Sequence, residues 1–78
     1  MDIKILGSGC AKCEQLEAAT RAAVGELGLD ADFEKVTDPA EIASWGVMAT
    51  PALVVDDEVV LSGRVPSATE VRELLADR

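Results

Sequence analysis

The sequence contains no histidine and only two cysteines, Cys10 and Cys13. A structural zinc site needs four sulfur or nitrogen ligands, so this composition argues against a closed zinc site. Cationic side chains are also scarce, with 7 Lys and Arg against 15 Asp and Glu and a net charge of −8. Nucleic acids and anionic membranes are bound by clustered Lys and Arg, so we expect neither as a partner.

Long hydrophobic runs are absent as well. The apolar runs are short, such as PALVV at residues 51–55, whereas a helix needs roughly 20 apolar residues to cross a bilayer. The N-terminal MDIKILGSG is interrupted too soon to resemble a signal peptide. We therefore expect a cytoplasmic protein, and in a reducing cytosol two close cysteines are more often catalytic or metal-binding than structural.

What the chain does contain is enough apolar material for one small core. Hydrophobic residues make up 49% of its 78 residues, and no repeats, low-complexity tracts or linkers interrupt it. This composition is typical of a single folded unit, which we expect to span residues 1–78.

Apolar periodicity and turn residues divide the chain into seven elements. Strands are predicted at 3–6, 29–36, 51–55 and 59–62, and helices at 11–27, from Pro39 to a stop at Gly46, and from Ser67 onward. The order β-α-β-α-β-β-α predicts an α/β fold, a four-stranded mixed sheet flanked by three helices. Its first three elements suit a parallel crossover, and the last two strands suit a hairpin.

Local signals support these helices. Asp38 followed by Pro39 is a typical helix start, and Ser67 with Glu70 matches a capping box. Glu17 and Arg21 are four residues apart, which places them side by side on a helix.

The two cysteines lie in the stretch GSGCAKC, between the first strand and the first helix. Positions three apart on a helix carry Cβ atoms about 5–6 Å apart, close enough to form a disulfide with little backbone movement. Cys10 stands at the start of the helix, where free N–H groups stabilise a thiolate.

Cys13 falls on the apolar stripe of the expected helix at 11–27, so we expect it to be buried and to act as the resolving thiol. The stripe recurs every three or four residues, at Cys13, Leu16, Thr20, Ala23 and Leu27. Gly7 and Gly9 are expected to let the loop adopt unusual backbone angles and to keep Cys10 uncluttered. Lys12 is expected to assist as a nearby cation.

Two other interpretations of the cysteines remain open. Paired thiolates also suit Cu(I), Zn(II) or another soft metal in a two-coordinate or shared site. Alternatively, the cysteines are small buried residues without chemistry.

Together with the segment MATPAL at 48–53, the Cys-x-x-Cys stretch resembles the thioredoxin superfamily. The likeness is greatest to the short prokaryotic redox-active disulfide proteins, which are thioredoxin-like or glutaredoxin-like, and it extends over almost the whole chain. It implies a thioredoxin-like fold and a protein-disulfide oxidoreductase with catalytic Cys10 and Cys13. It also implies a cis peptide bond before Pro51, with Thr50 and Pro51 contacting an extended substrate.

The resemblance further implies no cofactor beyond a reversible Cys10–Cys13 disulfide, disulfide-bonded protein substrates, and an upstream disulfide reductase. We expect a monomer. An alternative resemblance is to the heavy-metal-associated domain, which has Gly-x-x-Cys-x-x-Cys after its first strand and would make the chain a soft-metal or metalloid carrier. A third hypothesis is a non-catalytic interaction module on the same scaffold.

Overall fold

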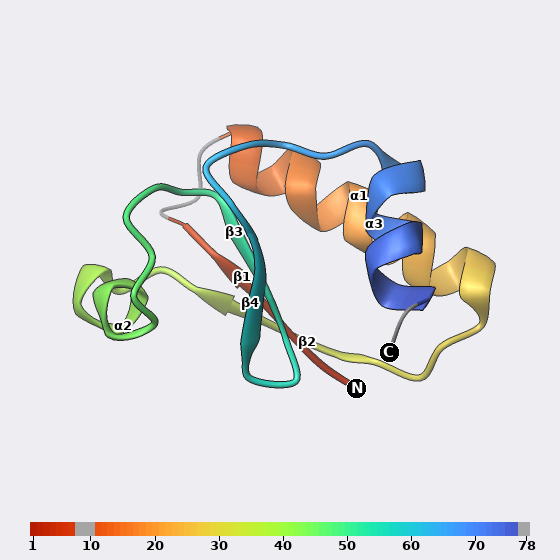
Figure 1. Cartoon of the computed structure of the whole chain (residues 1–78), viewed down its shortest axis with the longest axis horizontal. Helices are drawn as coiled ribbons and strands as arrows, with labels where there is room; N and C mark the ends of the chain where they lie inside the picture. The colour runs from red at the N-terminus through yellow and green to blue at the C-terminus, as the bar shows by residue number, and fades with distance from the viewer. Residues whose placement is uncertain (8–10, 77–78) are drawn as a thin grey trace.

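The computed structural model describes residues 1–7 and 11–76. The elements follow the order β1 (Asp2–Leu6), α1 (Ala11–Leu27), β2 (Asp32–Val36), α2 (Pro39–Ser44), β3 (Ala52–Val55), β4 (Glu58–Ser62) and α3 (Ala68–Ala76). This is the predicted β-α-β-α-β-β-α order. Figure 1 shows the sheet in the middle, with α1 and α3 beside one another on one side of it and α2 on the other.

The four strands form one mixed sheet in the order β2-β1-β3-β4. The central strand β1 runs parallel to β2 and antiparallel to β3, and β3 pairs antiparallel with β4. The α1 crossover therefore joins the parallel pair, and the tight β3–β4 connection is the predicted hairpin. Asp56 and Asp57 form its turn with φ of 49° and 66°, as a two-residue hairpin turn of the primed type requires.

The face of the sheet beneath α1 and α3 carries the larger core. Alternate residues of β1 and β3 point to this face and meet one side of each helix. The buried residues of this core are Ile3, Ile5, Leu16, Ala23, Val24, Leu53, Val55, Leu61, Val71 and Leu75. The stripe that predicted α1 is thus the side that packs against the sheet.

The opposite face carries a smaller core under a thinner cover. Its buried residues are Leu6, Val36, Ala52 and Val54, with Ile42, Trp45 and Val47 half-buried against them. Helix α2 has six residues, and none of them is buried. The Lys4 ammonium lies 5.8 Å from the centre of the Trp45 ring, so cation–π attraction adds to this packing.

The predicted boundaries of the helices and strands are correct at the start of α2 and wrong at the start of β2. The Asp38 carboxylate accepts a 2.9 Å hydrogen bond from Ala40 N, so the predicted cap of α2 is confirmed. At the end of α1, Gly28 N bonds Gly25 O and Leu29 N bonds Val24 O, the two bonds of a Schellman motif. Because Leu29 closes this helix end, β2 begins at Asp32 and not at residue 29 as predicted.

The start of α3 fits the predicted capping box only in part. Glu70 N donates to the Ser67 hydroxyl over 3.2 Å, but the Glu70 carboxylate does not return to Ser67. Both of its oxygens accept from the Arg64 guanidinium instead, which is a stronger, charge-assisted arrangement.

No helix in the described part of the chain is long and apolar enough to cross a membrane.

Candidate active site

Cys13 occupies the first turn of α1, on the side that faces the sheet. Its side chain is 6% exposed, whereas its neighbours Lys12 and Glu14 are exposed. The burial predicted for Cys13 is therefore confirmed. Cys10 and Gly9, the other expected site residues of this segment, lie outside the described residues.

Gly7, the residue after β1, lies directly against the Cys13 sulfur. A Cβ placed on Gly7 would stand 2.1 Å from Cys13 Sγ and 3.9 Å from Thr50 Cβ. No side chain fits at 2.1 Å, so only glycine allows the sulfur to lie this close to the end of β1. Gly7 thus brings together Cys13 and Thr50, which are 37 positions apart in the printed sequence.

Sequence reasoning gave Gly7 a different role, the supply of unusual backbone angles close to Cys10. The structure corrects this: the glycines with positive φ among the described residues are Gly28, Gly46 and Gly63. Gly7 is needed for its lack of a side chain beside Cys13.

The Thr50–Pro51 peptide bond is cis. Pro51 is fully buried, and its carbonyl accepts a 2.9 Å hydrogen bond from Gly63 N, at the end of β4. Thr50 is exposed and precedes Ala52, the first residue of β3 in the ladder with β1. A rigid, buried proline therefore holds an exposed residue next to Gly7 and Cys13.

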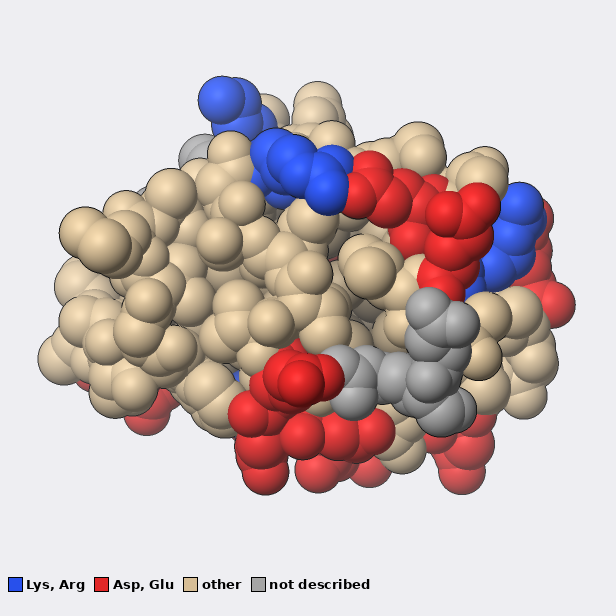
Figure 2. Space-filling model, viewed as in Figure 1, with Lys and Arg blue, Asp and Glu red and all other residues tan. Residues whose placement is uncertain are grey.

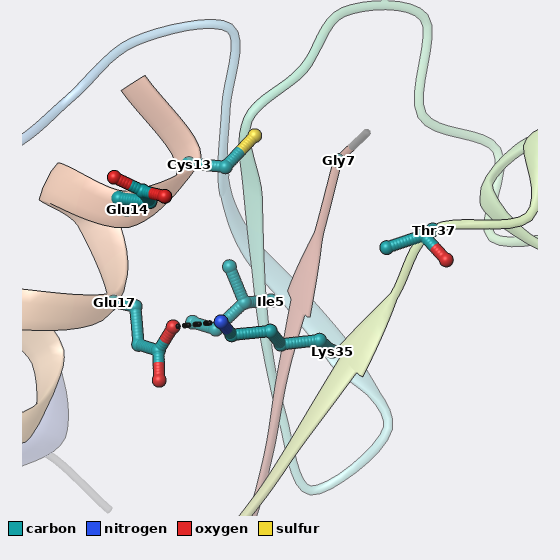
Figure 3. A pocket seen from close by; sticks show the side chains of 7 residues that line it. All are labelled: Ile5, Gly7, Cys13, Glu14, Glu17, Lys35 and Thr37. Atoms are coloured by element: carbon teal, nitrogen blue, oxygen red, sulfur yellow. Dashed lines mark ion pairs between the residues drawn. The ribbon is translucent and has the colours of Figure 1, made fainter. Parts of the chain in front are cut away.

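A small pocket of about 50 Å³ opens beneath Cys13, lined by Ile5, Gly7, Cys13, Glu14, Glu17, Lys35 and Thr37. Figure 3 shows the Cys13 sulfur near one end of this group, with the Glu17–Lys35 ion pair below it and Ile5 between them. Lys35 Nζ lies 2.9 Å from one Glu17 oxygen, and Arg21 Nε lies 2.9 Å from the other.

These two cations act on the ionisation of Glu17. The Lys35 ammonium, followed by the Arg21 guanidinium, holds the pKa of the Glu17 carboxyl below its ordinary value, because both donate to the ionised form. The predicted Glu17–Arg21 pair is confirmed. Lys35 was not foreseen, since it lies on β2 and reaches Glu17 only through the packing of α1 on the sheet.

A second, wider hollow of about 270 Å³ lies between α2 and the loop before β3. It is lined by Thr37, Pro39, Ile42, Ala43, Val47 and Thr50. None of these residues is charged. Thr37 belongs to both hollows and Thr50 borders this one, so the second hollow adjoins the surface around Cys13.

The surface beside this hollow also lacks charge. Residues 42–55 include no Asp, Glu, Lys or Arg, and Met48 in this stretch is 100% exposed. Figure 2 shows a broad uncharged area on the α2 side of the molecule, while acidic side chains gather near the β3–β4 turn. A fully exposed methionine two residues before Thr50 is a suitable contact for an apolar partner.

Two further residues lie near the site without joining it. Arg64 is bound to Glu70 at the start of α3, and this carboxylate raises the pKa of the Arg64 guanidinium. Trp45, at the C-terminal end of α2, packs on the smaller core. Within residues 1–7 and 11–76, no group of three or more Cys, Asp or Glu side chains is placed to hold a metal ion.

Comparison with known proteins gives three matches. The family model described as "Thioredoxin domain" matches residues 1–76. A thioredoxin of Methanothermobacter thermautotrophicus is 46% identical over 76 residues, which cover 97% of this chain and 99% of that protein. A thioredoxin of Methanocaldococcus jannaschii is 48% identical over 73 residues, covering 94% of this chain and 84% of that protein.

Proposed function

The chain belongs to the thioredoxin-domain family, and on that premise we propose that it is a protein-disulfide oxidoreductase whose catalytic pair is Cys10 and Cys13. The observation that carries the proposal is the meeting of Cys13, Gly7 and Thr50 beside the buried Pro51. A thiol and an exposed backbone segment are thereby held close together. Such a site can bind an extended substrate polypeptide while a cysteine sulfur of that substrate reacts.

In the first step, the Cys10 thiolate attacks one sulfur of a substrate disulfide. The substrate S–S bond breaks, a Cys10–substrate disulfide forms, and the other substrate sulfur leaves as a thiolate that takes a proton from water. The position of Cys10 before the first residue of α1 supports this role, because the N-terminal end of a helix favours negative charge.

In the second step, Cys13 loses its proton and attacks Cys10. The Cys10–substrate bond breaks, the reduced substrate leaves as a thiolate, and the Cys10–Cys13 disulfide remains. The burial of Cys13 suits this order, because a shielded thiol does not compete with Cys10 for the incoming disulfide. An external disulfide reductase must then supply two electrons to restore the dithiol.

The uncharged surface around Thr50 supports docking of polypeptide substrates. Thr50 offers its backbone outside the sheet ladder, and the adjoining hollow and Met48 offer apolar contacts. This surface lacks the cationic cluster that a nucleic acid or an anionic membrane would require. We further propose that the protein works as a cytoplasmic monomer over residues 1–78, without a cofactor. Lys12, exposed beside Cys13, is proposed as an auxiliary cation.

The test is a redox titration of the reduced protein in dithiol–disulfide buffers, quenched by alkylation and measured by mass. We expect one two-electron transition between the dithiol and the internally bridged form. Cys10→Ser should reduce turnover of a disulfide-bonded protein to the rate of the buffer alone. Cys13→Ser should trap a covalent enzyme–substrate disulfide, because the first step remains and the second is lost.

Retained turnover by Cys10→Ser would contradict the proposal, as would a pair that never forms an internal bridge. In the second case Cu(I) titration in competition with glutathione is the next experiment. Stoichiometric binding there would establish the alternative, a soft-metal or metalloid carrier using the same two cysteines.

A further inference from the structure

The chain contains two methionines, Met1 and Met48, and their surroundings differ. Met1 is half-buried, with its side chain packed against the larger core. Met48 is 100% exposed, so its thioether sulfur lies in solvent. Because oxidation of sulfur follows exposure, an oxidant in solution has readier access to Met48 than to Met1.

The exposure of Met48 follows from the residues on either side of it. Val47 packs against the smaller core. Ala49 lies against the end of β4, where a Cβ placed on Gly63 would stand 3.2 Å from the Ala49 Cβ. Both neighbours are held against the protein, and the side chain between them points outward. A fully exposed side chain has no packing to lose, so we expect a chemical change at its sulfur to leave the fold intact.

Met48 is also close to the proposed docking segment. It lies two residues before Thr50, and two residues of backbone span at most about 7 Å. The stretch 42–55 around them contains no Asp, Glu, Lys or Arg, so its contacts with a polypeptide come from apolar surface and backbone groups. The apolar, adaptable side chain of methionine suits such contacts.

Hydrogen peroxide converts a thioether to a sulfoxide in one step. The sulfur lone pair attacks a peroxide oxygen, the O–O bond breaks, an S=O bond forms, and water leaves. Sulfur is oxidised by two electrons, and these electrons reduce the peroxide. The apolar side chain becomes polar, and covering its S=O group with an apolar partner is unfavourable unless the oxygen finds a hydrogen bond.

We propose that Met48 is a site of peroxide modification, and that its conversion to methionine sulfoxide weakens the docking of disulfide-bonded proteins while the cysteine pair stays functional. The inference rests on the proposed function, because it requires substrates to dock beside Thr50. Mild oxidation also forms the Cys10–Cys13 bridge, which protects both cysteines because neither sulfur is then a thiolate. Among the described residues, Met48 carries the sulfur most open to solvent.

The first arm of the test locates the modification and does not depend on turnover. Protein with the Cys10–Cys13 bridge already formed is treated with hydrogen peroxide, and the sulfoxide at each methionine is followed by peptide mass mapping. We expect Met48 to be oxidised at least about fivefold faster than Met1, because it is the more exposed. Equal rates, or a faster rate at Met1, would overturn the inference.

The second arm measures docking. After removal of peroxide, the protein is reduced with dithiothreitol, which leaves the sulfoxide in place, and is assayed with insulin as the disulfide-bonded protein. We expect the KM for insulin to rise about threefold to tenfold, as for the loss of one apolar contact, with kcat retained. The reaction of the reduced protein with dithiobis(nitrobenzoate), a small disulfide that needs no docking surface, should keep its rate.

Variants separate Met48 from other peroxide damage. Met48→Leu has no sulfur at this position, so peroxide should not change its KM for insulin from the value of the untreated variant. Met48→Gln is polar without oxidation and should have the raised KM before any treatment. Val59→Gln is the matched control. Val59 is the other large hydrophobic side chain exposed in the described part of the chain, at 37%, and it lies on β4 near the hairpin turn, remote from Pro51. Its KM should equal that of the wild type.

The thermal unfolding midpoints of the oxidised protein and of these variants should stay within about 2 °C of the wild type, which verifies folding. Repair with two sulfoxide reductases, one for each sulfoxide epimer, should restore the original KM. An unchanged KM after complete oxidation of Met48 overturns the inference, and so does a raised KM in peroxide-treated Met48→Leu. If the untreated protein does not reduce insulin at all, the proposed function fails and the inference falls with it.

Discussion

The two faces of the sheet are covered to very different depths. Among the residues that the structure describes, the face under α1 and α3 carries the larger core, with ten buried hydrophobic residues. The face under the six-residue α2 and the loop after it carries the smaller core, with four such residues in the same described part of the chain. The thicker face holds the fold together, while the thinner face leaves hollows and uncharged surface around Thr50. A small domain can thus keep a binding surface by concentrating its stability on the opposite side.

The largest effect should come from a substitution in the thicker face. Leu53, on β3, is 0% exposed, so Leu53→Ala should lower the free energy of unfolding by about 2–5 kcal/mol. The matched change on the other side is Met48→Ala, which we expect to alter stability by less than about 0.5 kcal/mol. Urea denaturation measures both values.

The same pair should separate in activity. Met48→Ala is expected to raise the KM for a disulfide-bonded protein about threefold to tenfold, since about 1 kcal/mol of apolar contact is lost. If Met48→Ala destabilised the protein as much as Leu53→Ala, the two faces would not differ in the way described.

The next largest effect on stability should come from a substitution at Gly7, which lies at the end of β1 against Cys13. Gly7→Ala would place a Cβ 2.1 Å from Cys13 Sγ, so the sulfur or the end of β1 must move, at a cost of about 1–3 kcal/mol. We expect the second, bridge-forming step to slow as well. Gly25→Ala is the control: a Cβ there meets nothing within 4 Å, and alanine should stabilise the helix by up to about 1 kcal/mol.

Equal stability of Gly7→Ala and the wild type, measured by thermal and urea unfolding, would show that the approach of Cys13 to Gly7 is not restrictive.

The smallest effect should be seen in acid. The folded state holds the Glu17 pKa below its ordinary value, so it binds fewer protons there than the unfolded chain does. The stability from this carboxylate is present above the ordinary pKa of about 4.3 and is lost as pH falls through the lowered value. Because the pair is near the surface, the loss should be under about 1 kcal/mol.

Urea denaturation between pH 6 and about 3 tests this. The Glu17→Gln variant should lose less stability over that range than the wild type does. Parallel curves for the two proteins would refute the assignment.

Sequence reasoning was most reliable where local rules decide the structure. The element order and the Asp38 cap follow from neighbouring residues, and they are confirmed. The predicted start of β2 at residue 29 was wrong because Leu29 completes the C-terminal end of α1. The apolar periodicity around Leu29 fits both a helix end and a strand start, so it does not decide between them. The Glu70 side chain was predicted to complete a capping box with Ser67, but it binds the Arg64 guanidinium, which is a stronger, charged donor.

In the candidate site too, local patterns predicted some features, and features that depend on tertiary packing were missed. The burial of Cys13 follows from the apolar stripe of α1. The role of Gly7 and the pairing of Lys35 with Glu17 depend on how closely α1 packs on the sheet, which no spacing in the sequence reports. A carboxylate one helix turn after a buried cysteine, with a lysine on a later strand, is the sequence signal that would indicate such a pair.

The end of the loop before β3 has a consequence for amide hydrogen exchange. Residues Ala52–Val55 are buried on both faces and paired on both edges with β1 and β4, so their amides should exchange only through large-scale opening. Thr50 and the residues before it are exposed and should exchange far sooner. The boundary falls at Pro51, which has no amide proton. Exchange should therefore slow sharply within about three residues, between Thr50 and β3, so that a substrate contacts a segment that opens readily and is anchored at one end to a strand that opens rarely.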